Sequence, residues 1–383
     1  MTKEKQTRTW REINLNAIEH NIKEVRKKVN EHTMIMGVVK ADAYGHGAVE
    51  VSKAMLNAGV SRLAVAEVNE AEVLRKAGID VPVLILCPDN YVNIPKVIDL
   101  LVTPSVIDME YARLLSDAAK KAGKTVNIHI KLDTGMTRVG FNTTDESLNT
   151  ILEIANLPNI VIEGIFTHFA CADVLDRSIT DKQFEKYINF VNKLESKGLK
   201  IPIKHVANSA TIMRFPEYHL DMVRSGIISY GYSPLEEGIP CDIDLIPAMT
   251  VKSKITRINN VPKEISISYG HTYTTEKDET KIATVPIGYA DGYLRSLSGK
   301  VHMSLGGKPV PVVGRICMDQ CMIDVTSVNN SNVGDEVIIF GDGRNSVITA
   351  DTIAELSGTI SYEIVCMLSN RVPFIFIKDG EIW

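Results

Sequence analysis

The sequence lacks the features that mark membrane, secreted and nucleic-acid-binding proteins. Nowhere in its 383 residues do ~18 consecutive apolar residues occur, the length that a membrane-spanning helix needs. The charged start MTKEKQTRTWREIN is not followed by the apolar segment of a secretory signal. No basic stripe with interleaved aromatic residues is present, and the formal net charge is -5. We therefore expect a soluble, cytoplasmic protein that binds neither membranes nor nucleic acid.

Patterns of metal ligands are missing as well. The six cysteines are scattered, and no C-x-x-C pair or Cys/His cluster has the spacing of metal ligands. We expect reduced thiols and no metal site. What is present is the composition of a folded globular protein, with 45% hydrophobic and 23% charged residues. At roughly 150 residues per domain, this length indicates two or three domains.

Short apolar runs alternate with amphipathic stretches over the first 230 residues. Ile18, Ile22 and Val25, for example, share one helical face. The candidate strands are Met34–Lys40, Leu63–Ala66, Val83–Leu86, Leu100–Thr103, Val126–Leu132, Ile162–His168, Ile203–Asn208 and Met222–Tyr230. Eight strands alternating with helices within about 250 residues match a closed (β/α)8 barrel, and the commoner alternative is an open doubly wound sheet. We favour the barrel because no G-x-G-x-x-G motif opens a helix in the chain.

The carboxyl-terminal part of the chain has a different composition. From Met249 to Trp383 it is rich in Val, Ile and Thr and interrupted by Gly and Pro, with one helical stretch near Thr349–Ser357. We therefore predict an α/β protein with a (β/α)8 barrel over residues 1–240 and a mainly-β domain over residues 241–383. Residues 9–15 have the character of a strand that could pair with the β domain.

A lysine stands at the carboxyl end of the first candidate strand, where barrel enzymes place catalytic residues. Met34, Met36 and Val38 share its face, so Lys40 is the only charged group there and leans toward the barrel interior. A strand-end lysine is most often a solvated cap. A desolvated lysine has a lowered pKa, and its neutral amine can form a Schiff base. The apolar neighbours favour this second interpretation.

The fifth candidate strand has a polar face that cannot pack against an apolar helix layer. Its polar residues alternate with apolar ones: Asn127, His129, Lys131 and Asp133. We expect them to line the barrel interior, where Lys131 needs an anionic partner or must be neutral. The DTGMTRVG segment that follows brings Arg138 near the strand mouth. An internal ion-pair network explains this feature equally well when it is taken alone.

The loops after the seventh and eighth candidate strands have the chemistry of a phosphate site. Asn208 and Ser209 lie in HVANSA, and Ser225-Gly226-Ile227 lies in MVRSGI. Small and hydroxyl-bearing residues let backbone N–H groups approach a phosphate at this end of a barrel. Asn-Ser is also an ordinary helix cap, so either motif alone is weak. Arg224 comes just before the second loop, and a Schiff-base lysine with a phosphate site suggests pyridoxal phosphate.

Several motifs together resemble the alanine racemase family. They are VVKADAYGHG, KLDTGMTRVG, HVANSA, MVRSGIISYG, ISYGHTY, IGYADGY, GRICMDQCMIDV and ISYE, with His168 at the end of the sixth candidate strand. The resemblance runs from about Trp10 to the C-terminus. It implies a pyridoxal 5'-phosphate enzyme, built as a barrel plus a β domain, that interconverts L-alanine and D-alanine and supplies D-alanine for peptidoglycan.

The resemblance also implies roles for single positions. Lys40 would bear the cofactor in a Schiff base, and Arg224 would face the pyridine nitrogen with His168 beside it. The remaining cofactor-binding residues, mainly around the phosphate, would be Tyr44, Asn208, Ser209, Gly226, Ile227 and Tyr362. The substrate carboxylate would be bound by Arg138 and the backbone at Met318. The supporting positions would be Lys131, which is often carbamylated in the family, Tyr289 and Asp319.

Racemisation needs a base on each face of the cofactor, and the resemblance implies Lys40 and Tyr269 for these roles. Tyr269 lies in the β domain, so the family's arrangement is a head-to-tail homodimer in which the partner donates it. An ordinary tyrosine titrates near 10, so positive groups would have to lower its pKa, and Arg224 and His168 are the candidates.

Three alternatives remain open on the sequence. A decarboxylase of the same barrel class would keep the lysine and the phosphate site, but should carry an acidic partner for the pyridine nitrogen. A non-catalytic cofactor-carrying barrel would lack residues 245–383. A serine or broad-specificity amino-acid racemase of the same family is the third alternative, although such relatives often carry an added membrane segment.

Overall fold

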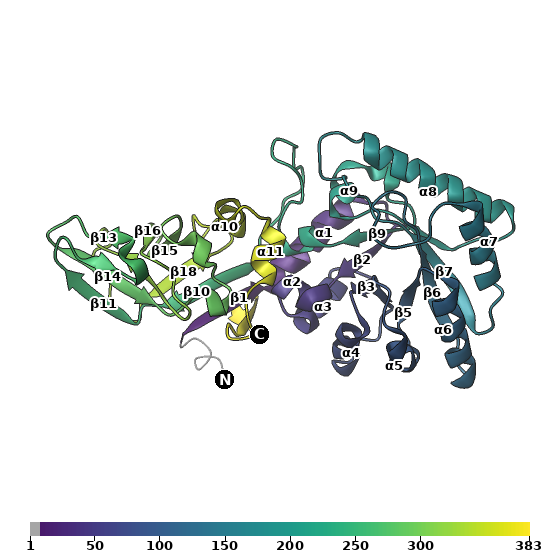
Figure 1. Ribbon diagram of the computed structural model, residues 1–383, viewed down its shortest axis with the longest axis horizontal. Helices are drawn as coiled ribbons and strands as arrows, with labels where there is room; N and C mark the ends of the chain where they lie inside the picture. Colours follow the sequence, from purple (N-terminus) through teal and green to yellow (C-terminus); the bar gives the residue numbers. More distant parts are fainter. Residues whose placement is uncertain (1–7) are drawn as a thin grey trace. The chain divides into compact units, whose positions relative to one another are not determined.

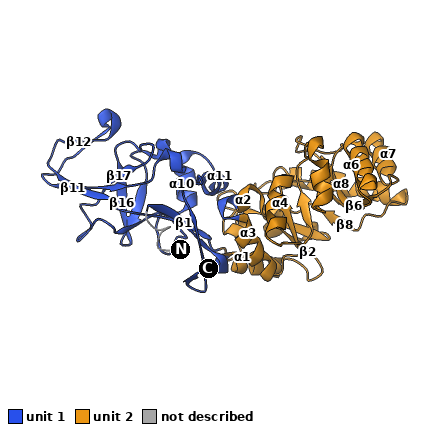
Figure 2. Ribbon diagram, turned by 90° about the horizontal axis from the view of Figure 1, so that it is seen from below, with its two compact units in different colours: residues 1–17, 44–47, 246–383 blue, residues 18–43, 48–245 orange. Residues whose placement is uncertain are grey.

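The computed structural model describes residues 8–383, which divide into two compact units. The barrel unit consists of residues 18–43 and 48–245, drawn in orange in Figure 2. The β unit, drawn in blue, combines the described residues up to Ala17 with residues 44–47 and 246–383. Within residues 8–383, no helix combines the length and apolar character needed to cross a membrane.

The barrel unit is built around eight parallel strands: β2 (Met34–Val38), β3 (Arg62–Val65), β4 (Val83–Ile85), β5 (Thr103–Val106), β6 (Val126–Lys131), β7 (Ile160–Phe166), β8 (Ile203–His205) and β9 (Met222–Ser225). Their order is β8-β7-β6-β5-β4-β3-β2-β9, so the first and last strands of the unit pair with each other (Figure 1). Between β8 and β9, the Asp221 N–H donates to the Lys204 carbonyl (3.1 Å) and the Arg224 N–H to the Ala207 carbonyl (3.0 Å). The predicted (β/α)8 barrel is confirmed, in a nearly closed form.

Helices precede and connect the strands of the barrel unit. They are α1 (Leu15–Lys28), α3 (Ala48–Asn57), α4 (Val68–Lys76), α5 (Ile94–Asp99), α6 (Met109–Lys121), α7 (Asp145–Ile154), α8 (Ser178–Ser196) and α9 (Ser209–Arg214), with short 3-10 helices η1 (Tyr91–Asn93), η2 (Pro216–Tyr218) and η3 (Ile227–Tyr230). In α6, Tyr111, Leu115 and Ala119 are buried on one face. Its N-terminus is capped by Asp108, whose carboxylate accepts the Tyr111 N–H at 2.7 Å.

Six of the predicted barrel strands match the observed ones to within one to three residues at an end, and two differ more. The apolar run Leu100–Val102 is a turn rather than a strand, because Leu100 caps α5 and Leu101 has a φ of 50°. The fourth barrel strand is therefore Thr103–Val106. The last barrel strand ends at Ser225 instead of Tyr230, because the backbone at Gly226 (φ -103°, ψ -112°) leaves the strand and η3 begins.

The β unit is a ten-stranded sheet in the order β11-β14-β17-β16-β15-β18-β10-β1-β19-β20. Its strands are β1 (Thr9–Asn14), β10 (Met249–Lys254), β11 (Arg257–Val261), β14 (Thr280–Val285), β15 (His302–Leu305), β16 (Lys308–Val313), β17 (Cys321–Asp324), β18 (Glu336–Phe340), β19 (Phe374–Lys378) and β20 (Glu381–Ile382). A separate pair, β12 (Ser266–Ile267) and β13 (Tyr273–Thr274), lies outside this sheet. Helices α10 (Ala350–Ser357) and α11 (Ser361–Cys366) complete the unit with η4 (Tyr269–His271), η5 (Tyr289–Asp291) and η6 (Arg295–Leu297).

The first strand of the chain belongs to the sheet of the β unit. β1 pairs antiparallel with β10 and parallel with β19. Trp10 and Ile13 on β1 are fully buried. Burial of large apolar side chains contributes roughly 1.5–3 kcal/mol each, so this strand fastens the amino-terminal end of the chain to the β unit.

Candidate active site

Lys40 follows the first barrel strand and begins a turn of unusual handedness. The strand ends at Val38, and the short helix α2 (Lys40–Gly45) has φ values of 51–53° at residues 41–43. These are left-handed values, which cost about 1–2 kcal/mol for each non-glycine residue. The Ala43 N–H donates to the Val39 carbonyl (2.9 Å), and the Ala41 N–H donates to Glu70 Oε1 (2.6 Å). The half-buried Lys40 is therefore held at the start of a strained and anchored turn.

Arg224 is a buried cation at the carboxyl ends of the barrel strands. Its guanidinium donates to the carbonyl oxygens of Thr167 (2.9 Å), Val206 (3.1 Å) and His205 (3.2 Å). Two ring nitrogens also face it, His205 Nδ1 at 3.0 Å and His168 Nδ1 at 3.3 Å. Arg224 is only 4% exposed, and burial lowers its pKa to about 10. Arg224 therefore remains a cation at neutral pH, and none of these partners is a carboxylate.

His168 is a neutral imidazole beside Arg224. Burial, followed by the charges of Arg224 and Lys131, lowers the pKa of His168 well below its usual value. A guanidinium can only donate hydrogen bonds, so Nδ1 of His168 accepts and the ring carries its proton on Nε2. The structure thus brings together two residues that the sequence analysis placed side by side.

Lys131 lies inside the barrel, as the polar face of the fifth strand predicts. It is 4% exposed, and its ammonium nitrogen lies 3.1 Å from the Leu132 carbonyl and 5.0 Å from the Phe166 ring centroid. Burial, and then the charges of Arg224 and Arg138, lower the pKa of Lys131 to about 7. A large fraction of Lys131 is therefore neutral at physiological pH, which lowers the cost of burying this amine without an anionic partner but does not remove it.

Arg138 is exposed in the loop that follows β6. The loop folds around Asp133, whose carboxylate accepts the backbone N–H groups of Gly135 (2.9 Å), Thr137 (3.0 Å) and Arg138 (2.7 Å). Burial opposes the ionisation of Asp133, but these three N–H donors lower its pKa overall. The Asp133 carboxylate thus fixes the backbone that carries Arg138.

The loops after β8 and β9 are joined by a hydrogen bond. The backbone N–H of Gly226 donates to the Ser209 hydroxyl at 3.0 Å, and both Ser209 and Ile227 are buried. Asn208 is the N-cap of α9, where its side-chain oxygen accepts the Thr211 N–H at 3.0 Å. The helix-cap interpretation of Asn208 therefore holds, and Ser209, Gly226 and Ile227 lie together beside the cap.

Tyr269 projects from the β unit with 71% of its surface exposed. It lies in η4, between two positive φ values at Ser268 (67°) and Gly270 (71°). The Ser268 hydroxyl donates to the Arg315 carbonyl at 2.7 Å, and this hydrogen bond joins the turn to the loop after β16. Tyr269 lines an open pocket of about 420 Å³ together with Met318 and Asp319.

The loop that contains Met318 is held by the segment around Tyr289. The N–H groups of Tyr289 and Ala290 donate to the carbonyls of Cys317 (3.1 Å) and Met318 (3.0 Å). A Cβ atom at Gly288 would lie 2.3 Å from the Cys317 carbonyl oxygen, so only glycine permits this approach. Tyr289, Met318 and Asp319 therefore belong to one packed assembly of two loops.

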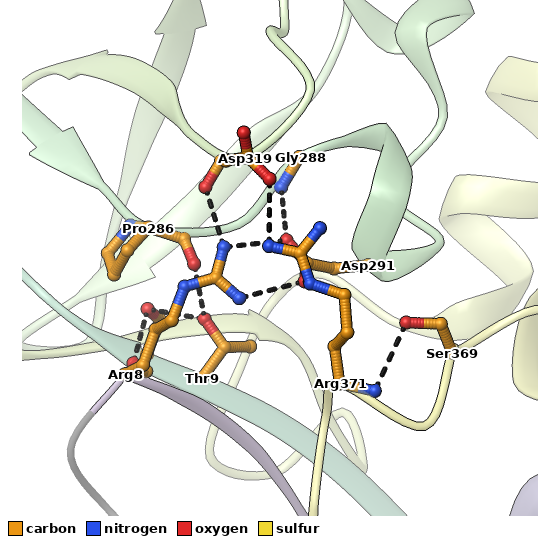
Figure 3. A network of polar contacts seen from close by, with 9 residues as sticks. Arg8, Thr9, Pro286, Gly288, Asp291, Asp319, Ser369 and Arg371 are labelled. Carbon is orange, nitrogen blue, oxygen red and sulfur yellow. Dashed lines mark hydrogen bonds and ion pairs between the residues drawn. The ribbon is translucent and has the colours of Figure 1, made fainter.

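Two arginines and two aspartates clamp the same assembly (Figure 3). Asp291 is fully buried and accepts hydrogen bonds from Arg8 Nη1 (2.9 Å) and Nη2 (3.1 Å). Nε of Arg371 lies 3.3 Å from Oδ1 of the same aspartate. Arg371 also donates to Asp319 (2.7 Å), and Arg8 donates to the Asp319 carbonyl (2.9 Å). Arg8, Asp291 and Arg371 were not among the site residues predicted from the sequence, although Asp291 lies in the IGYADGY motif two residues after Tyr289.

Tyr44 and Tyr362 form an aromatic pair in the β unit, with ring centroids 6.0 Å apart. Tyr44 is 8% exposed, and burial followed by the neighbouring Tyr362 and Cys366 raises the pKa of its hydroxyl. The phenol stays protonated at neutral pH and can act as a hydrogen-bond donor. Gly45 permits the close packing beside this pair, because its Cβ would lie 2.2 Å from the Val365 carbonyl oxygen.

Comparison with known proteins finds similarity to one family along nearly the whole chain. The family model described as "Alanine racemase, N-terminal domain" matches residues 13–234, and the one described as "Alanine racemase, C-terminal domain" matches residues 248–376. Alanine racemase of Clostridium perfringens (strain SM101 / Type A) is 48% identical over 375 residues, which covers 97% of this chain and 96% of that protein. The structure of alanine racemase from Clostridium difficile 630 has a TM-score of 0.95 at 43% identity, with coverage of 98% and 97%. A structure described as that enzyme in complex with cycloserine has a TM-score of 0.92 at 42% identity, again covering 98% of this chain and 97% of that one.

Proposed function

Since this chain belongs to the alanine racemase family and its activity is the interconversion of L-alanine and D-alanine, we propose that it works with pyridoxal 5'-phosphate and with two bases, Lys40 and Tyr269. The relatives named above support alanine racemase activity and not the serine or broad-specificity alternative. They also give no support to a decarboxylase or a non-catalytic carrier.

The residues of the chain fit this cofactor in their donor chemistry. Lys40 offers an amine at an anchored turn, and Arg224 offers a buried cation that has no carboxylate among its partners. Ser209, Gly226 and Ile227 offer a hydroxyl and backbone N–H groups, with Asn208 capping the adjoining helix. The protonated hydroxyl of Tyr44 is a further donor suited to a phosphate, and the Tyr362 hydroxyl belongs to the same aromatic pair. When bound, the cofactor supplies the electron-withdrawing ring that acidifies the α-proton of alanine.

The main support for this proposal is that Arg224 is a buried cation with no carboxylate among its partners. An acidic residue at the pyridine nitrogen would hold a proton there, whereas a guanidinium offers only N–H groups and remains charged. Arg224 in this position would limit electron withdrawal by the ring and so restrain side reactions such as transamination. His168, neutral and hydrogen-bonded to Arg224, presents its Nε2–H away from the guanidinium.

We propose that Arg138 and the backbone at Met318 bind the substrate carboxylate. Arg138 is exposed and its backbone is fixed by Asp133. The Met318 carbonyl is already engaged by Ala290, which fixes the orientation of the neighbouring peptide groups. Lys131 has a pKa near 7, and its neutral amine could take up carbon dioxide to form a carbamate that would pair with Arg138. Tyr289 and Asp319 would support the Met318 loop.

The two bases would act on opposite faces of the substrate. Lys40 would remove and return the proton on one face, and the phenol of Tyr269 on the other. Tyr269 projects into solvent from the β unit, so a partner chain would use it to complete its own site in a homodimer. An ordinary tyrosine titrates near 10, so the cation Arg224 would have to stabilise the phenolate, helped by the Nε2–H of His168, which is a neutral donor rather than the positive group expected from the sequence.

A panel of amino acids tests the proposed chemistry. Purified protein loaded with pyridoxal 5'-phosphate should racemise L-alanine and D-alanine, and removal of the cofactor should abolish the activity until it is added back. L-serine, L-lysine and L-glutamate serve as comparison substrates, with D-product formation measured by chiral chromatography. Racemisation of alanine that persists at the full rate in cofactor-free protein would overturn the proposal.

A further inference from the structure

A string of hydrogen-bonded side chains runs through the barrel interior from Arg224 to the opposite ends of the strands. Arg224 Nη1 lies 3.0 Å from His205 Nδ1, and His205 Nε2 lies 2.9 Å from His129 Nδ1. His129 Nε2 lies 3.2 Å from Glu163 Oε2, and Arg62 binds both Glu163 oxygens at 2.9 Å. Both histidines are completely buried, whereas the Glu163 and Arg62 side chains are 17% and 15% exposed. We call these five residues the histidine string.

The hydrogen bonds of the histidine string can run in only one direction. Arg224 donates only, so His205 Nδ1 must accept and the proton of His205 lies on Nε2. That proton is donated to His129 Nδ1, so the proton of His129 also lies on Nε2. It is donated in turn to the carboxylate of Glu163, which can only accept. Burial lowers the pKa of both rings, in agreement with neutral imidazoles.

The backbone is built to place Glu163 and His129 in this contact. The register between β6 and β7 shifts, with Ile128 opposite Ile162 but His129 opposite Gly164, so Glu163 is an extra residue in a β-bulge. Bulges turn a side chain away from the regular alternation of a strand. A Cβ atom at Gly164 would lie 2.5–2.7 Å from three atoms of the His129 ring. The bulge and the glycine together make room for the ring and turn the carboxylate toward it.

We propose that Glu163 and His129 are positioning residues for Arg224. The Glu163 carboxylate, beyond both histidines in the string, fixes the tautomers of both rings, so that a ring nitrogen is always available to accept from Arg224. This keeps the guanidinium at the barrel mouth without a carboxylate in contact with it. The consequence for catalysis rests on the proposed function of Arg224, whereas the direction of the histidine string stands on the contacts alone.

The substitution Glu163→Gln should reverse the direction of the hydrogen bonds in the histidine string. Arg62 can only donate, so it would bind the amide oxygen and leave the amide NH2 facing His129 Nε2. His129 would then carry its proton on Nδ1, and His205 would be driven to the same tautomer. An N–H of His205 would face an N–H of Arg224, and the guanidinium would lose this acceptor.

Three variants separate this role from a merely structural one. Glu163→Gln removes the carboxylate from both neighbours, while Arg62→Gln breaks the same ion pair but leaves the carboxylate on His129. Gly164→Ala keeps every charge and displaces the His129 ring, and it serves as the second test if Glu163→Gln does not fold. Gly164 has no positive φ, so alanine introduces no backbone strain there.

The readouts are the protonation of the rings and the kinetics of the cofactor-loaded enzyme. NMR of protein carrying ¹⁵N-labelled histidine should show both rings protonated on Nε2 in the wild type and in Arg62→Gln, and on Nδ1 in Glu163→Gln. The kcat for alanine should fall about ten- to hundredfold in Glu163→Gln and Gly164→Ala, by analogy with the hydrogen-bond partners that orient metal ligands. KM should change little, because Arg224 is not a substrate ligand in the proposal.

Equal loss of kcat in Arg62→Gln and Glu163→Gln would overturn the proposal, as would wild-type tautomers in Glu163→Gln. Failure of the wild type to racemise alanine, with the ring protons shifting as described, would instead refute the proposed function and leave the histidine string intact.

Discussion

Nη2 of Arg224 lies 3.3 Å from Nδ1 of His168. The contact joins a buried cation on β9 to a neutral imidazole that follows β7, and it leaves the second ring nitrogen of His168 to donate elsewhere. Because the other partners of Arg224 are carbonyls and a second imidazole, the positive charge is not cancelled within the barrel.

Replacing Arg224 by Glu should slow racemisation and increase side reactions such as transamination. A carboxylate would favour a protonated pyridine nitrogen and stronger electron withdrawal, so racemisation should fall roughly hundredfold, as for the loss of one preorganised donor. Pyruvate formation from alanine and a new long-wavelength absorption band should appear. Arg113→Glu, on the exposed surface of α6, is the matched control. An unchanged spectrum in a folded, cofactor-loaded Arg224→Glu variant would remove Arg224 from this role.

Lys40 is expected to be the lysine that carries the cofactor. Purified protein should absorb in the visible range, and reduction with borohydride should attach the cofactor to the peptide that contains Lys40. Mass spectrometry of the digested protein identifies the peptide. Lys40→Ala should lose the visible band and the activity. Label recovered on the neighbouring interior lysine, Lys131, would refute the assignment.

The Lys131 ammonium should make stability depend on pH. Its pKa is about 7 in the folded protein against an ordinary value of 10.5, so the unfolded chain binds the extra proton between these values. Stability therefore rises with pH through this window, and the cost of burying Lys131 is greatest at and below about pH 7. In carbonate-free buffer, Lys131→Met should melt above the wild type at pH 7, and the gap should shrink toward pH 9. Lys121→Met, at an exposed position, should show no such trend; a gap that is constant with pH would contradict the prediction.

Much of the barrel could be predicted from the sequence because its strands are short apolar runs with a regular spacing. The polar face of β6 was equally informative, since His129 and Lys131 could not face an apolar helix layer. The fourth strand was placed wrongly because Leu100–Val102 is more apolar than the true strand, which contains Pro104. Local hydrophobicity cannot separate a buried turn from a strand when the run is this short.

The long-range pairs could not be predicted from the sequence. Arg8 and Asp291 are 283 residues apart, and Arg62 and Glu163 are 101 residues apart. Nothing in the local pattern of either partner marks the contact. The bulge that turns Glu163 inward depends on the register between two strands, which is a property of the assembled barrel. The roles of Tyr269 and Met318 came from the resemblance to a family rather than from spacing or composition.

The active sites are expected to be shared between two chains, because Lys40 belongs to the barrel unit and Tyr269 to the β unit. Lys40→Ala and Tyr269→Ala should each be nearly inactive. Under subunit exchange, about half of the dimers become mixed, with one intact site of two, so activity should recover to about a quarter of the wild type. Exchange confirmed by mass spectrometry without any recovery would show that the sites are not shared.

Solvent-deuterium exchange at the α-carbon in Tyr269→Phe shows whether two bases serve opposite faces of alanine. Lys40 would serve D-alanine and Tyr269 would serve L-alanine. Exchange into each enantiomer can be followed by NMR, with Tyr273→Phe, the next tyrosine in the ISYGHTY motif, as the control. Exchange from L-alanine should be lost far more severely than exchange from D-alanine. Equal loss for both enantiomers would contradict it and favour a single base.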